Sequence, residues 1–75
     1  MARLKWPDAD EIGFQLSKKL PDIDPLTVRF TDLRRHVTDL PEFADDPAGS
    51  SETILEAIQM AWLAYYRENR PAESR

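Results

Sequence analysis

Prolines end the first two predicted helices of this chain, because a proline ring cannot continue a helical hydrogen-bond ladder. Pro21 follows an apolar series, Ile12, Leu16 and Leu20, in which each residue is four positions from the next. That spacing predicts a helix of about twelve residues with one apolar stripe. Pro41 closes a second apolar series in the same way. The chain is therefore expected to fold by packing small helices against one another.

The first helix is predicted to begin at Asp8. A carboxylate there can accept a hydrogen bond from a free amide of the first turn, and Glu11 stands three residues later, where a capping box requires an acid. Asp10 and Glu11 also place negative charge at the positive end of the helix dipole.

The second helix is predicted to have Thr31 as its N-cap and to bury Leu33, Val37 and Leu40, which are spaced four and three residues apart. Residues 26–30 alternate apolar and polar side chains. So short a segment fits either an extended element or one helical turn, and the sequence leaves both open.

The third and longest helix is predicted to begin at Ser50 or Ser51 and to reach about Asn69. Its inner face should comprise Ile54, Ile58, Ala61, Trp62 and Tyr65, widened by Leu55 and Leu63. Phe43 should anchor the preceding loop, residues 42–49, to the core. We expect one mostly α-helical, compact three-helix domain over residues 1–66 and a frayed polar tail over residues 67–75.

Cysteine is absent from the 75 residues, so the protein has no disulfide, thiolate metal site or cysteine nucleophile. No apolar run approaches the roughly 20 residues of a membrane span, and the first residues lack the apolar core of a secretory signal. We expect a cytoplasmic monomer that does not contact membranes.

Negative charge is concentrated in the body of the chain. Residues 8–56 hold twelve acids and five bases, a net charge of −7, while the whole chain carries −4. Such a body repels phosphate backbones and favours a cationic partner, either a metal ion or a basic protein surface. Nucleic acid is therefore not an expected ligand. The basic pairs Lys18-Lys19 and Arg34-Arg35 are interpreted as ion-pair partners on exposed helix faces.

Motifs of enzymes are missing from the sequence. It lacks the glycine-rich phosphate loops and the H-E-x-x-H zinc motif, and His36, its one histidine, has no serine or acid in a recognisable triad. We expect that the protein is not an enzyme. No tightly bound cofactor is predicted. We do predict weak Fe²⁺ binding by five carboxylates, those of Asp8, Asp10, Glu11, Asp45 and Asp46.

Several motifs in fixed order resemble those of one known family. They are LKW at residues 4–6, EIG at 11–13, PDIDP at 21–25, TVRFTDL at 27–33, DDP at 45–47, ILEAI at 54–58 and WL at 62–63. On these motifs the chain is similar to the IscX family of bacterial iron–sulfur cluster assembly proteins.

The resemblance implies a compact helical fold of modified winged-helix type. It also implies an adaptor that binds the cysteine desulfurase IscS through an acidic face, in competition with frataxin, and that modulates sulfur delivery. The alternative is an iron donor or iron sensor, in which Fe²⁺ binding is itself the signal. The acids that match the family pattern, and are thus the candidate partner-binding residues, are Asp8, Glu11, Asp22, Asp24, Asp32, Asp39, Asp45, Asp46, Glu52 and Glu56.

This chain departs from the family pattern at three places. Ala44 stands where another acid is common, and the residues after the WL pair are close to neutral where the family is acidic. His36 and Thr38 replace an aromatic residue and a cysteine. The first two departures lower the local negative charge, which weakens the expectation of iron binding more than that of protein binding.

Overall fold

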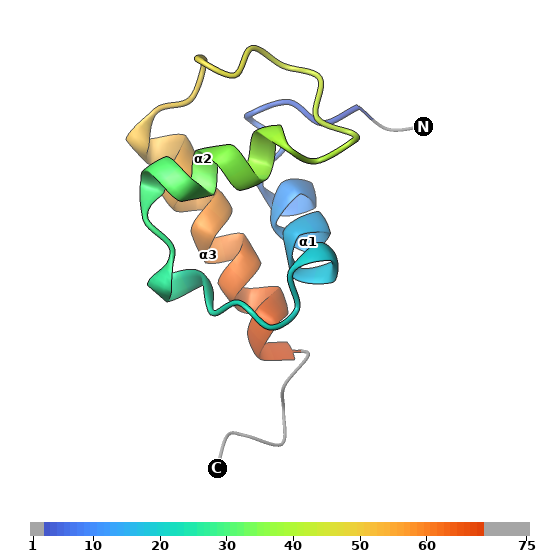
Figure 1. The fold of residues 1–75 in the computed structure, drawn as a ribbon, viewed down its shortest axis with the longest axis vertical. Helices are drawn as coiled ribbons and strands as arrows, with labels where there is room; N and C mark the ends of the chain where they lie inside the picture. Colours follow the sequence, from blue (N-terminus) through green and yellow to red (C-terminus); the bar gives the residue numbers. More distant parts are fainter. Residues whose placement is uncertain (1–2, 69–75) are drawn as a thin grey trace.

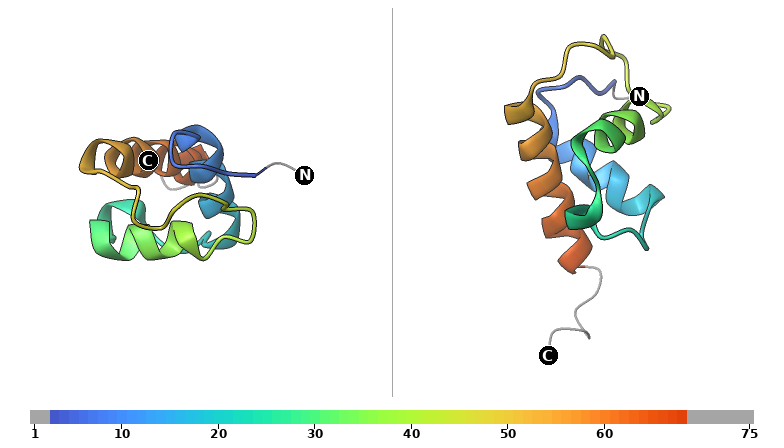
Figure 2. Two further views of the ribbon diagram at one scale, coloured as in Figure 1. Left: turned by 90° about the horizontal axis from the view of Figure 1, so that it is seen from above. Right: turned by 60° about the vertical axis from the view of Figure 1, so that its left-hand side comes forward.

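Three helices surround one core in the computed structural model, which describes residues 3–68 (Figure 1). The helices are α1 (Ala9–Lys19), α2 (Phe30–Thr38) and α3 (Glu52–Glu68), and a short 3₁₀ turn, η1 (Pro25–Thr27), precedes α2. Helices α1 and α3 pack closely against each other, and α2 forms a second layer across them (Figure 2). The predicted three-helix, mostly α-helical architecture is confirmed.

The start of α1 lies where the sequence predicted it, but the predicted capping box does not form. Asp8 occupies the N-cap position without a side-chain capping bond; its Oδ2 instead accepts a hydrogen bond from the amide of Lys5 at 3.0 Å. Glu11 accepts from the side-chain amide of Gln15, one turn on, at 3.3 Å. The acids of this first turn thus bond the preceding segment and the helix surface.

Helix α2 begins at Phe30, and its N-cap is Arg29, two residues before the predicted cap Thr31, in extended conformation with no side-chain capping bond. Thr31 lies inside the first turn, so its prediction as the cap was wrong. Both alternatives for the preceding segment occur in succession. A 3₁₀ turn forms first, with the Asp24 carboxylate accepting from the amide of Leu26 at 3.0 Å, and the backbone is then extended at Val28.

Helix α3 begins after Ser51, whose hydroxyl accepts a hydrogen bond from the amide of Ile54 at 3.3 Å. The sequence left the choice of N-cap open between Ser50 and Ser51, and the structure shows that it is Ser51. The most buried residues of α3 are Leu55, Ile58, Trp62 and Leu63, while Ile54, Ala61 and Tyr65 are only half-buried. The inner face is thus rotated towards Leu55 and Leu63, which the sequence had placed at its margins.

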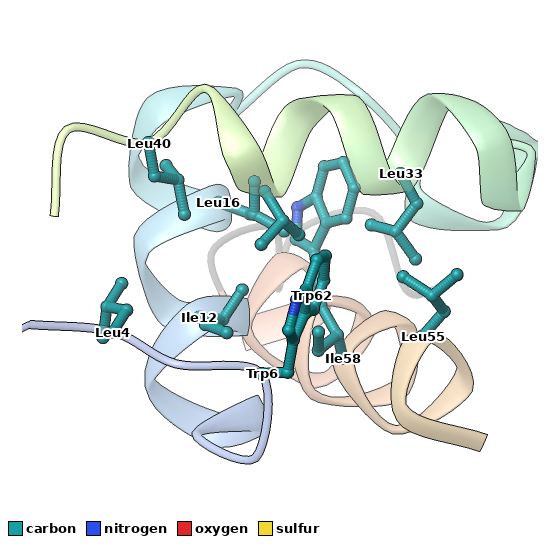
Figure 3. Packing of buried hydrophobic residues seen from close by; sticks show 10 residues of the cluster. Leu4, Trp6, Ile12, Leu16, Leu33, Leu40, Leu55, Ile58 and Trp62 are labelled. Carbon is teal, nitrogen blue, oxygen red and sulfur yellow. The ribbon is translucent and has the colours of Figure 1, made fainter. Parts of the chain in front are cut away.

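The core is built around two tryptophans, Trp6 and Trp62, that lie in the middle of the apolar cluster (Figure 3). Around them pack Leu4, Ile12, Leu16, Leu33, Val37, Leu40, Leu55 and Ile58. Among the described residues, the Nε1 atom of Trp62 is the one buried side-chain polar atom without a hydrogen-bond partner. The ring of His36, half-buried, meets Trp62 edge-on with ring centroids 6.3 Å apart.

The N-terminal segment is held against the loop before α3. Leu4 and Phe43 form an isolated parallel β-bridge, in which Leu4 donates to the carbonyl of Glu42 and accepts from the amide of Ala44, both at 2.8 Å. The rings of Trp6 and Phe43 meet edge to face at 4.8 Å, so the predicted anchoring role of Phe43 is confirmed. Residues 3–68 contain no strand beyond this bridge, and the winged-helix detail is not confirmed.

Gly13 sets the distance between α1 and α3. A Cβ atom at this position would lie 2.6 Å from the backbone nitrogen of Trp62 and 2.7 Å from the Cβ of Ala61. Only a residue without a side chain permits this approach.

Helix α3 is described as far as Glu68, and the predicted end at Asn69 and most of the predicted tail, 67–75, lie outside the described residues. None of the helices within residues 3–68 has both the length and the apolar character needed to cross a membrane.

Candidate acidic docking surface

The ten predicted partner-binding acids all reach solvent. Eight are exposed, and Asp24 and Asp45 are half-buried. Within residues 3–68 none of the ten forms an ion pair with a lysine or arginine at 4.0 Å or less. Because no internal cation neutralises them, these carboxylates present their charge to the surroundings.

Half of these acids are held in place by hydrogen bonds. Asp8, Asp24, Asp45 and Asp46 each accept from a backbone amide, and Glu11 accepts from Gln15. Such bonds fix the direction of a carboxylate and leave its charge intact. These five acids therefore serve local structure as well as any partner.

The other five acids bond to nothing within the described part of the chain. They are Asp22, Asp32, Asp39, Glu52 and Glu56. Asp32 lies in the first turn of α2, and Glu52 and Glu56 lie one turn apart at the start of α3. These side chains are free to turn towards a cation that approaches from solution.

Asp45 joins the loop to the N-terminal segment. Its Oδ2 accepts from the amide of Trp6 at 3.1 Å, and its Oδ1 accepts from the amide of Asp46 at 2.7 Å. The amides of Trp6 and Asp46 hold the pKa of the Asp45 carboxyl below its ordinary value, with a smaller contribution from the positive charge of Lys5. Asp45 is therefore ionised at neutral pH.

The acids predicted to bind iron form two groups along the chain, one within residues 8–11 and one at Asp45 and Asp46, and both groups approach the same N-terminal segment. Asp8 bonds the amide of Lys5 and Asp45 bonds the amide of Trp6, so both groups border consecutive residues of one segment. Asp10 is engaged elsewhere, because its Oδ2 accepts from the Tyr65 hydroxyl at 3.1 Å. Within residues 3–68 no three or more Asp, Glu or His residues are arranged to hold a metal ion. Iron binding stays a prediction.

Tyr65 links α3 to the start of α1 through that bond. The bond to Asp10 raises the pKa of the Tyr65 hydroxyl above its ordinary value, because the neutral hydroxyl is the form that donates. Its ring also meets Phe14 edge-on at 5.2 Å. Sequence periodicity had assigned Tyr65 to the inner face and gave no sign of its polar contact.

Fold and surface together define a small, mostly helical domain that carries many solvent-reaching carboxylates without an ion-pair partner in residues 3–68. Comparison with known proteins is more specific. The sequence profile of the family described as "Iron-sulphur cluster assembly" matches residues 4–67. The chain belongs to this family, the IscX family.

A protein of Pseudomonas aeruginosa described as uncharacterized is similar to this chain, with 57% identity over 60 residues. The alignment covers 80% of this chain and 91% of the Pseudomonas protein. The resemblance inferred from short motifs is thereby confirmed over nearly the whole described domain.

Proposed function

We propose that this protein is a non-catalytic, cytoplasmic adaptor of iron–sulfur cluster assembly that docks by its carboxylates on a basic surface of the cysteine desulfurase IscS. In doing so it modulates sulfur delivery and competes with frataxin for the same surface. The observation that carries the proposal is the set of ten solvent-reaching carboxylates without an ion-pair partner in residues 3–68, in a chain of the cluster-assembly family.

Complementary charge on two proteins steers their encounter and contributes to affinity. Both effects decline as salt screens the charges, and the screening length falls to about 8 Å near 0.15 M ionic strength. The proposal therefore requires an affinity that falls as salt rises.

The test is calorimetric titration of the protein into purified desulfurase at about 0.05 M and about 0.3 M salt, values that bracket this screening range. The double variant Glu52→Gln/Glu56→Gln removes two charges that bond to nothing in residues 3–68, so it should weaken binding several-fold without loss of folding. Lys19→Gln, which removes an exposed positive charge, is the matched control and should bind at least as tightly. Affinity that is equal at both salt concentrations would refute electrostatic docking.

An iron donor or sensor is the second candidate, favoured by the approach of the two acid groups to the segment of Lys5 and Trp6. In this reading Asp8, Asp10, Glu11, Asp45 and Asp46 would provide weak oxygen ligands for Fe²⁺. Repeating the titration without oxygen, with and without Fe²⁺, separates the two candidates. Binding that requires Fe²⁺, and is lost in Asp8→Asn/Asp10→Asn, favours the sensor; binding that ignores Fe²⁺ favours the adaptor.

A further inference from the structure

A hollow of about 420 Å³ lies beside α2, and no carboxylate is among the residues that line it. Its lining consists of Thr31, Arg34, Arg35, Thr38, Pro47 and Ala48. One wall is thus α2 and the other is the loop before α3. It is a cationic hollow on a protein whose net charge is −4.

The four α2 residues form one stripe along the helix. Thr31, Arg34, Arg35 and Thr38 are spaced at i, i+3, i+4 and i+7, which places them on one face. This face differs from the one that buries Leu33 and Val37. Two guanidinium groups and two hydroxyl groups therefore gather on the same side of the hollow.

Neither arginine is neutralised within the described part of the chain. The ion pairs expected for Arg34 and Arg35 from the sequence are not formed within residues 3–68, where no carboxylate comes within 4.0 Å of them. The nearest acid along the loop wall, Asp46, turns its Oδ1 to the amide of Ala48 at 3.0 Å. The five N–H donors of each arginine are available to a ligand.

A second, smaller hollow of about 120 Å³ adjoins the first, since Thr31 and Arg34 line both. Phe30 and Leu55 provide its apolar lining. The two hollows together offer a cationic end and an apolar end, joined at Arg34.

We propose that this cationic hollow binds a small oxyanion, a phosphate monoester or a carboxylate, that carries a short apolar group. Arginine matches both oxyanions because its planar fork can donate two parallel hydrogen bonds to a pair of oxygens. The apolar group would occupy the smaller hollow against Phe30 and Leu55. A long polyanion is disfavoured, since residues 8–56 carry a net charge of −7 and would repel its remaining phosphates. This proposal does not rest on the proposed docking to the desulfurase.

The test is an NMR titration of the ¹⁵N-labelled protein with inorganic phosphate, phenyl phosphate and benzoate at constant ionic strength. Saturable shifts are expected at the amides of residues 31–38 and of Ala48, with phenyl phosphate binding more tightly than phosphate. Benzoate that fails to bind identifies the ligand as a phosphate, whereas equal binding identifies a general oxyanion site.

Arg34→Gln and Arg35→Gln should each weaken phenyl phosphate binding about tenfold, the loss expected for a charge-assisted hydrogen bond. Arg67→Gln, at an exposed arginine of α3, is the matched control and should leave the affinity unchanged. Shifts that grow linearly with concentration for all three ligands would overturn the proposal. So would equal affinities in Arg34→Gln, Arg35→Gln and Arg67→Gln.

Discussion

Replacement of Gly13 by alanine tests the close contact of α1 and α3 most directly. The added methyl group would lie 2.6 Å from the backbone nitrogen of Trp62, 2.7 Å from the Cβ of Ala61 and 2.8 Å from the Ala61 carbonyl carbon. Ordinary contacts of a Cβ atom begin at 3.4 Å. Two of the three obstructing atoms belong to the backbone of α3, so no side-chain rotation can relieve them, and the helices must move apart.

Two opposing effects set the magnitude of the change. Overpacking a core position costs about 1–3 kcal/mol, and the upper end applies here because the obstruction is mostly backbone. Alanine recovers about 1 kcal/mol, since it favours the helix interior over glycine by that amount. The net loss of unfolding free energy is therefore about 2 kcal/mol, which in a domain of this size lowers the melting temperature by about 10 °C.

Thermal unfolding followed by far-UV circular dichroism, with urea unfolding at one temperature, measures this loss. Gly49→Ala is the matched control. The nearest atoms to its new Cβ are the Asp46 carbonyl oxygen and Trp6 Cδ1, both at 3.3 Å, and its φ is not positive, so its stability should change by less than about 1 kcal/mol. A Gly13→Ala protein that melts at or above the native temperature would refute the reasoning, because helix propensity would then outweigh the contact.

Three further changes test single contacts. Trp6→Phe removes the indole bond to the Asp46 carbonyl, 2.7 Å long, and part of a buried ring, and urea unfolding should show a loss of about 2 kcal/mol. Asp45→Asn should be less stable than the native protein at neutral pH but not in acid. The folded-state pKa of Asp45 lies below its ordinary 3.8, so the contribution of the ionised carboxylate to stability is present above that pH and is lost as the pH falls through the folded value. A stability difference that persists unchanged in acid would contradict this assignment. Tyr65→Phe should show the opposite pH dependence of stability, being less stable than the native protein below pH 10 but not in strong alkali. The folded-state pKa of Tyr65 is raised above its ordinary 10.0, so the contribution of its hydroxyl to stability is complete below that pH and is lost as the pH rises through the folded value. An absorbance titration that shows no raised tyrosine pKa would exclude the bond to Asp10.

Helix number and most helix limits could be predicted because they follow from local signals. The spacing of Ile12 and Leu16 and the position of Pro21 depend only on neighbours in sequence, and α1 agrees with them. The errors arose where a choice depended on packing. Thr31 was assigned as a cap from its residue type, but the extended backbone at Arg29 begins the helix earlier. The predicted inner face of α3 was rotated relative to the observed one, because sequence periodicity cannot show which side of the helix meets α1.

The candidate site was predictable in composition and not in arrangement. Counting charges located the acids, but their roles depend on contacts between distant segments, such as that of Asp45 with Trp6, 39 residues away. The bond of Tyr65 to Asp10 joins residues 55 apart and leaves no local pattern. For the same reason, the sequence could pair Arg34 and Arg35 with acids only by assumption, whereas residues 3–68 leave both unpaired.

Acids that are held by hydrogen bonds and acids that are not differ in what it costs a partner to bind them. An acid that already bonds a backbone amide, such as Asp24 or Asp46, can meet a cation without a further loss of side-chain freedom. An unbonded acid, such as Glu52, must be immobilised by its partner, at a cost of up to about 1.5 kcal/mol for a rotamer-rich side chain. Neutralising a held acid, however, also weakens the fold. The unbonded acids are therefore the positions where a loss of binding can be attributed to the interface itself.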